Sequence, residues 1–221
     1  MFGWAVSRNL MKSNPARDAK PFRYASDGFH TWTLAEVQQF EARHPVGTKA
    51  RLALALLLFT GARRGDVVTF GRQHIKSGWL SFVPNKTRHK RARRSEKPIL
   101  PELAQIISNS PCGDLTLLVT EYGKPFTAAG FGGWFRKRCD EAGLPHCSAH
   151  GLRKAGATIA AENGATDRQL MALFDWETAS QANTYTAAAN RKRLAGEAAK
   201  LLAAGEQSGN TECPTEMSHQ K

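Results

Sequence analysis

The chain has 221 residues, of which 41% are hydrophobic, so it can bury one core of the size of a catalytic domain. Its 31 lysine and arginine residues against 19 acidic residues give a net charge of +12, which predicts a polyanionic partner. No apolar run reaches the roughly 18 residues of a membrane span, and no signal-peptide pattern follows Met1, so we expect a cytoplasmic protein without a membrane partner.

The first third of the chain predicts a helix end, a linker and two further helices. Residues 1–12 have the apolar spacing of the end of a helix, and the polar stretch 15–29 has the composition of a linker. Thr33-Leu34-Ala35-Glu36 is a capping box that predicts a helix to about His44. The next helix, 47–60, carries a continuous apolar run and should lie at the centre of the core.

This core helix runs into the stretch Thr60-Gly61-Ala62-Arg63-Arg64-Gly65-Asp66. Gly61 suits a helix C-cap, so Arg63 would project from the end of a rigid element. Asp66 could hold Arg63 or a nearby histidine by hydrogen bonds. The alternative is an arginine that only complements the negative end of the helix dipole, and for this stretch taken alone the alternative is favoured.

Two predicted strands, 79–83 and 97–100, flank a segment that is dense in positive charge. We call this segment the basic hairpin; its cations are Lys86, Arg88, Lys90, Arg91, Arg93 and Arg94. Such a run can be a solvated loop, but with the overall charge we favour contact with DNA phosphates.

The remaining elements follow from caps and apolar spacing. Helices are expected over 101–110, 127–142, 166–174, 178–188 and 191–204, with an extended segment at 115–120 and a disordered tail from 205. The aromatic residues of the 127–142 helix are expected in the core rather than stacked on bases.

Ser148 predicts the N-cap of another helix, and on that helix His150 and Arg153 project from one face. A fixed cation beside an imidazole, near free backbone N–H groups, suits a phosphate oxygen. The alternative is a surface histidine with a solvated arginine, which is favoured for the pair taken alone.

The four cysteines show no CxxC spacing. A metal site of His146, Cys147, His150 and Cys139 can be drawn, but zinc ligands normally come in tight pairs. We therefore expect reduced thiols and no metal site.

Together these segments resemble the catalytic domain of the tyrosine recombinases, the integrase family of site-specific DNA recombinases, from about Phe29 to Ala204. The resemblance rests on five motifs in the family's order: Arg63 with Asp66, Lys86-Thr87, His150-Gly151-Leu152-Arg153, Asp175-Trp176, and Tyr185. Asp175 replaces the family's usual glycine, and the tryptophan that follows it occurs in a minority of members.

The resemblance implies a mainly α fold with a small antiparallel β-sheet (α+β). It implies cleavage and rejoining of DNA strands through a 3′-phosphotyrosyl intermediate, without metal, ATP or any cofactor. The implied roles are a phosphate clamp of Arg63 and Arg153, a nucleophile Tyr185, an acid Lys86, a hydrogen-bond donor Trp176, and a donor or proton acceptor His150.

The resemblance also implies how the chain is divided. Residues 1–28 would be the end of a core-binding domain plus a linker, 29–189 the catalytic domain, 190–204 a helix docking on a neighbouring protomer, and 205–221 a disordered tail.

The expected partners are double-stranded DNA and further copies of the chain, in a synaptic tetramer for full-length family members. Accessory DNA-bending or directionality factors and a nucleoid-associated location are also expected. The alternatives are nicking and closing of the type IB topoisomerase kind, and a DNA-binding remnant that does not cut.

Overall fold

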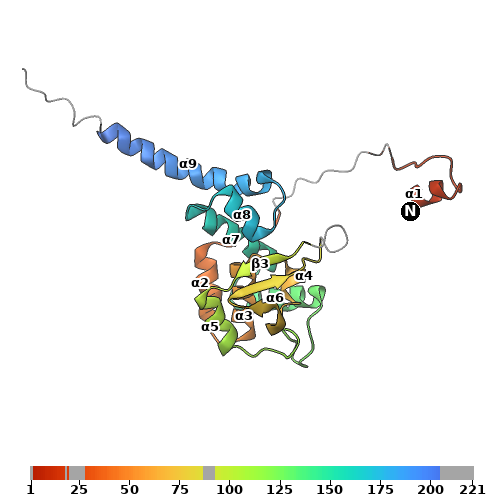
Figure 1. Ribbon diagram of the computed structural model, residues 1–221, viewed down its shortest axis with the longest axis horizontal. Coiled ribbons are helices and arrows are strands. Elements are labelled where there is room, and N and C mark those ends of the chain that lie inside the picture. Colours follow the sequence, from red (N-terminus) through yellow and green to blue (C-terminus); the bar gives the residue numbers. More distant parts are fainter. Residues whose placement is uncertain (1, 18, 20–27, 87–92, 205–221) are drawn as a thin grey trace, which may run out of the picture.

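The computed structural model describes residues 2–17, 19, 28–86 and 93–204. Its helices are α1 (Phe2–Ser7), α2 (Leu34–Arg43), α3 (Lys49–Thr60), α4 (Arg64–Val67), α5 (Pro101–Asn109), α6 (Ala128–Glu141), α7 (Ala149–Glu162), α8 (Asp167–Phe174) and α9 (Ala179–Ala204). A 3₁₀ turn, η1 (Arg72–His74), precedes the strands β1 (Ile75–Lys76), β2 (Trp79–Phe82) and β3 (Ser95–Pro98). The predicted fold class, mainly α with a small antiparallel sheet, is therefore confirmed (Figure 1).

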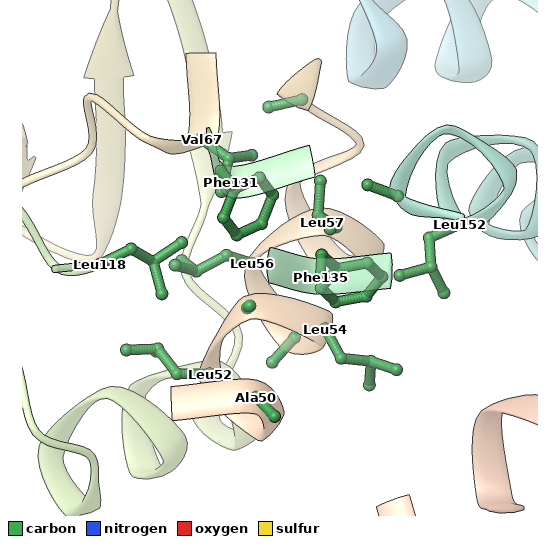
Figure 2. Close-up of a cluster of buried hydrophobic side chains, with 14 of the residues drawn as sticks. Ala50, Leu52, Leu54, Leu56, Leu57, Val67, Leu118, Phe131, Phe135 and Leu152 are labelled. Carbon is green, nitrogen blue, oxygen red and sulfur yellow. The ribbon is translucent and has the colours of Figure 1, made fainter. Parts of the chain in front are cut away.

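Helix α3 lies at the centre of the core, as its apolar run predicts. Its leucines from Leu52 to Leu57 are fully buried, because residues of every face of this helix meet other elements. Figure 2 shows Phe131 and Phe135 of α6 lying against it. Both rings are fully buried, so the prediction that the aromatic residues of this helix belong to the core is confirmed for them.

The sheet has the order β1-β2-β3 with antiparallel neighbours. Leu80 of β2 pairs with Lys97 of β3, and Phe82 pairs with Ser95. Ser95 and Lys97 point inward and are buried, whereas the alternate residues of β3 are exposed. The return strand thus begins two residues earlier than predicted, and it places a lysine in the interior.

A smaller apolar cluster joins α7, α8 and α9 through Ala157, Leu170, Phe174 and Ala182. Helix α9 is continuous over 26 residues, so the prediction of separate helices at 178–188 and 191–204 is wrong. The intervening residues are Ala189 and Asn190, neither of them a glycine or proline, so nothing local interrupts the helix. From residue 190 to 202 every side chain is exposed, and this half of α9 projects from the body of the molecule (Figure 1).

Side-chain caps start most of the predicted helices where expected. Thr33, Thr127, Ser148 and Thr166 each accept a hydrogen bond from a backbone N–H of the first turn.

Other local predictions differ from the structure. Helix α1 ends at Ser7 rather than near residue 12. The segment 115–120 contributes one isolated bridge, between Val119 and Pro125, instead of a strand. The predicted tail from 205 lies outside the described residues. Within those residues, no helix is long and apolar enough to cross a membrane.

Candidate active site

Arg153 is the structural centre of the candidate site. It lies on the second turn of α7, is 7% exposed, and donates hydrogen bonds to the carbonyl oxygens of Gly61 and Phe174. Its guanidinium therefore joins the C-terminal ends of α3 and α8. Burial and the neighbouring charge of Arg63 together lower the pKa of Arg153 to about 10. The guanidinium group therefore remains a cation at neutral pH. A guanidinium has five N–H donors, so these two bonds leave capacity for an anion.

Gly61 makes this arrangement possible. It ends α3 with φ 58°, in the left-handed region. A Cβ at this position would lie 2.5 Å from Cε1 of Phe174, so no other residue fits here without displacing that ring. The turn then delivers Arg63, the half-buried N-cap residue of α4, next to Arg153.

Two clefts meet at Arg63. The larger, of about 720 Å³, is lined on the hairpin side by Arg93 and Arg94 and on the helix side by Trp176. The smaller, of about 420 Å³, is lined by Arg64, Arg136 and His150. Positive side chains on both sides of Arg63 make this surface suited to a polyanion.

His150 lies at the start of α7 and is exposed, with its ring centroid 4.8 Å from that of Phe29. Burial of the ring lowers its pKa below 6.5, and the neighbouring charges of Arg153, Lys154, Arg63 and Arg64 act in the same direction. The imidazole is therefore neutral at pH 7 and able to accept a proton.

Tyr185 and Trp176 form a stacked pair with centroids 5.3 Å apart and planes 9° from parallel. Trp176 also stacks on Phe174 at 5.1 Å, and the guanidinium carbon of Arg153 lies 5.8 Å from its ring centroid. Burial raises the pKa of Tyr185, against the influence of Arg153, so the phenol is protonated at neutral pH. A phenol in this state needs a proton acceptor to act as a nucleophile.

The turn before Trp176 contains an ion pair that the sequence did not reveal. Asp175 ends α8 with φ 51°, the conformation that the family's usual glycine would favour. Its carboxylate accepts hydrogen bonds from Nζ of Lys97 at 2.9 Å and from Oγ of Ser95 at 2.8 Å. The turn is thus retained despite the substitution. The alternation of buried and exposed residues along β3 could have suggested that Lys97 points inward. It could not have suggested that Asp175 is the partner of Lys97.

Asp66 is buried and accepts a hydrogen bond from the backbone N–H of Asn85 at 2.8 Å. Burial raises its pKa, partly offset by that bond and by the charge of Arg63. The Asp66 carboxylate thus anchors the turn after β2, whereas the sequence had suggested a bond to Arg63 or to a nearby histidine.

Lys86 is exposed in the turn that follows β2, and within the described residues no contact joins it to Arg153 or Tyr185. Arg88, Lys90 and Arg91 lie outside the described residues. The two remaining cations of the basic hairpin, Arg93 and Arg94, line the larger cleft. Of the predicted catalytic residues, Arg63, Trp176 and His150 line the clefts. Arg153 and Tyr185 lie next to the ring of Trp176.

Comparison with known proteins gives a consistent result. A model of the phage integrase family matches residues 33–192. The integrase of Mycobacterium phage L5 is 28% identical over 223 residues, which cover 90% of this chain and 59% of that protein. The chain therefore spans about three fifths of the length of this relative.

Solved structures share the fold at low sequence identity. A lambda integrase(75–356) dimer bound to a COC′ core site has a TM-score of 0.67 at 18% identity, covering 84% of this chain and 68% of that one. The Tn1549 transposon integrase in complex with transposon right end DNA has a TM-score of 0.65 at 15% identity, and the match covers 87% of this chain and 75% of that one. XerA recombinase has a TM-score of 0.65 at 16% identity, and the match covers 80% of this chain and 67% of that one.

Proposed function

The chain belongs to the phage integrase family, and we propose that it cleaves and rejoins DNA strands in site-specific recombination, through a 3′-phosphotyrosyl intermediate. The observation that carries the proposal is the buried guanidinium of Arg153, beside Arg63 and next to the stacked Trp176–Tyr185 pair. A cation held in place before the substrate arrives stabilises charge that develops in the transition state without reorganisation.

The proposed step transfers a phosphoryl group from DNA to the protein. The phenol oxygen of Tyr185 forms a bond to phosphorus, and the bond from phosphorus to the 5′-oxygen breaks. The phenol proton passes to the neutral imidazole of His150, and the leaving 5′-oxygen takes a proton from Lys86, whose ammonium group is exposed.

Charge on the two non-bridging oxygens is stabilised by hydrogen-bond donors that are already in place. Arg63 and Arg153 present planar guanidinium groups, which suit the bidentate geometry of a phosphate. The indole N–H of Trp176 supplies a further donor, but it cannot carry a proton. We propose that these cations fill the role that a metal has in other nucleases, and that no ATP is needed because the ester bond to Tyr185 conserves the energy.

We further propose that residues 29–189 are the catalytic domain and that residues 190–204 dock on a neighbouring protomer. The exposed half of α9, with Leu194, Leu201 and Leu202 open to solvent, supports this assignment. Double-stranded DNA and a second copy of the chain are the proposed partners. Accessory DNA-bending or directionality factors and nucleoid association belong to the same proposal.

The proposal is tested by trapping the covalent protein–DNA adduct on nicked duplexes, from which the short fragment that carries the released 5′-hydroxyl diffuses away. Mass spectrometry of the trapped peptide should place the adduct on Tyr185. Tyr185→Phe should abolish the adduct and leave DNA affinity nearly unchanged, because phosphate contacts carry affinity. Tyr122→Phe is the matched control, since Tyr122 is 80% exposed and outside both clefts. An adduct of unchanged yield in Tyr185→Phe would refute the assignment.

A further inference from the structure

We infer that His30, Glu36, His146 and Cys147 form a binding site for one zinc-like divalent ion. One potential ligand atom from each residue lies within 4.8 Å of all the others. The site lies where the segment 28–33, which we call the strap, crosses the start of α7. From the sequence we considered a site of His146 and Cys147 with Cys139 and His150 and expected no metal site, whereas the fold brings His30 and Glu36 to His146 and Cys147.

The two imidazoles of the cluster contact Glu36 at hydrogen-bond distances, which are shorter than the spacing of ligands around a bound ion. Nε2 of His30 lies 2.9 Å from both carboxylate oxygens of Glu36, and Nε2 of His146 lies 2.6 Å from Oε1. Zinc holds its ligands at about 2.0–2.3 Å, so ligand atoms in a tetrahedral site lie roughly 3.3–3.8 Å apart. Small rotations of these side chains are therefore enough to admit an ion.

The donor set selects the kind of ion. Two imidazoles, a thiolate and one carboxylate suit zinc and its borderline-soft neighbours rather than magnesium or calcium, which prefer oxygen ligands. Four protein ligands also fill a tetrahedral shell, which is typical of structural rather than catalytic zinc.

Glu36 is already oriented for this role by the cap of α2. Its Oε2 accepts hydrogen bonds from the backbone N–H of Thr33 at 2.7 Å and from the Thr33 hydroxyl at 3.1 Å. Oε1 is left to face His146. A carboxylate ligand held by a second hydrogen bond in this way is common around bound metals.

The strap is held on α7 by contacts on both sides of His30. Lys154 donates from Nζ to the carbonyl oxygen of Phe29 at 2.8 Å, and Trp32 donates from Nε1 to that of Ser148 at 2.9 Å. A Cβ on Gly151 would lie 2.2 Å from the carbonyl oxygen of His30, so only glycine allows this approach. The backbones of the ligands are thus ordered in advance, which lowers the entropic cost of binding.

Cys147 distinguishes this cluster from an ordinary surface pair of histidine and glutamate. Its side chain is fully buried, and burial raises the pKa of the thiol to about 12. Binding would release the thiol proton to solvent as the sulfur–metal bond forms. The half-exposed imidazoles of His30 and His146 open the cluster to solvent on the other side.

The ion would fasten the strap to the first turn of α7. Cys147 immediately precedes Ser148, the N-cap of the helix that carries His150, and Phe29 of the strap contacts the His150 ring. Bound metal would therefore stabilise the fold at the edge of the smaller cleft. This inference does not depend on the proposed function.

The test is a titration of the metal-free chain with Co²⁺, followed by displacement with Zn²⁺. We expect one equivalent to bind, with a thiolate-to-cobalt charge-transfer band and tetrahedral ligand-field bands. Cys147→Ser should remove the charge-transfer band, and His146→Ala should weaken Zn²⁺ binding at least about tenfold. Cys112→Ser is the matched control and should leave the band unchanged, since Cys112 lies outside the cluster.

Thermal unfolding gives a second readout that does not depend on the cysteine variant remaining folded. Zn²⁺ at a hundredfold excess over its Kd should raise the Tm by roughly 5–10 °C, and His146→Ala, at a half-exposed position, should reduce that rise by about half or more at the same Zn²⁺ concentration. Absence of the charge-transfer band in the unmodified chain, or Zn²⁺ binding that is equal in His146→Ala, would overturn the inference.

Discussion

Nζ of Lys97 lies 2.9 Å from Oδ1 of Asp175, although the two residues are 78 positions apart. The pair joins β3 to the turn that carries Trp176. The lysine side chain is 1% exposed and the aspartate 25%, so the pair is partly shielded from water. Nζ also donates to the carbonyl oxygen of Ala172 at 3.1 Å, which ties the last turn of α8 to the sheet.

Breaking this pair should destabilise the fold. Asp175→Asn keeps a residue that tolerates the left-handed conformation, but it leaves Lys97 buried without a counter-charge. We expect a loss of about 2–3 kcal/mol in the free energy of unfolding, measured with urea. The double variant with Lys97→Met should recover part of the loss, and Glu96→Gln, at an exposed neighbouring position, should have little effect. Additive losses in the double variant would contradict a coupled pair.

The two arginines should differ in what they contribute besides catalysis. Arg63→Lys and Arg153→Lys should each slow adduct formation by about 10²-fold or more, because lysine cannot reproduce the planar fork. Arg153→Lys should also lower the Tm, since it removes the bonds to Gly61 and Phe174, whereas Arg63→Lys should not. Single-turnover rates and thermal unfolding separate the two effects. Losses of less than threefold in both rates would place the arginines outside the site.

Acid should slow cleavage only below pH 6.5. The pKa of His150 is lowered from that value, so the imidazole stays neutral, and able to accept the phenol proton, to a lower pH than an ordinary histidine does. The measurement is the pH dependence of the adduct-forming rate. Arg64→Gln removes one of the charges that lower this pKa and should move the midpoint upward. A midpoint that stays in place, or moves downward, would exclude His150 as the acceptor.

The basic hairpin should contribute equally to the affinity for DNA of any base sequence. Neutralising Arg93 and Arg94, which line the larger cleft, should weaken binding to all duplexes alike. Each lost phosphate contact should reduce the slope of log K against log salt by about 0.9. Lys76→Gln on β1 serves as the charge-matched control for each single arginine variant. An unaltered slope would show that these side chains do not touch the DNA backbone.

The exposed half of α9 should matter for assembly and not for folding. A chain that ends at Asn190 should keep its Tm, because every side chain from 190 to 202 is exposed. It should lose DNA-dependent self-association, measured by sedimentation velocity with short duplexes. Glu197→Gln controls for a mere change of charge on the helix. A lower Tm in the shortened chain would mean that this helix stabilises its own domain.

Local patterns in the sequence were sufficient for most helices and for the core. Thr33, Thr127, Ser148 and Thr166 start their helices as predicted, because a cap is a bond between residues two or three positions apart. The apolar run of α3 likewise predicts its own burial. The motifs around Arg63, His150 and Tyr185 predicted the candidate site, because their order along the chain is visible without coordinates.

Only the tertiary structure decided which distant groups meet. The sequence shows Lys97 and Asp175 as two charges far apart, and it shows His30 and Glu36 as unrelated to His146 and Cys147. Nor does it show that Arg153 binds the ends of two other helices. These contacts arise because packing α7 and α8 against α3 and the sheet brings them into range, and the strength of an ion pair or a metal site depends on that spacing and burial.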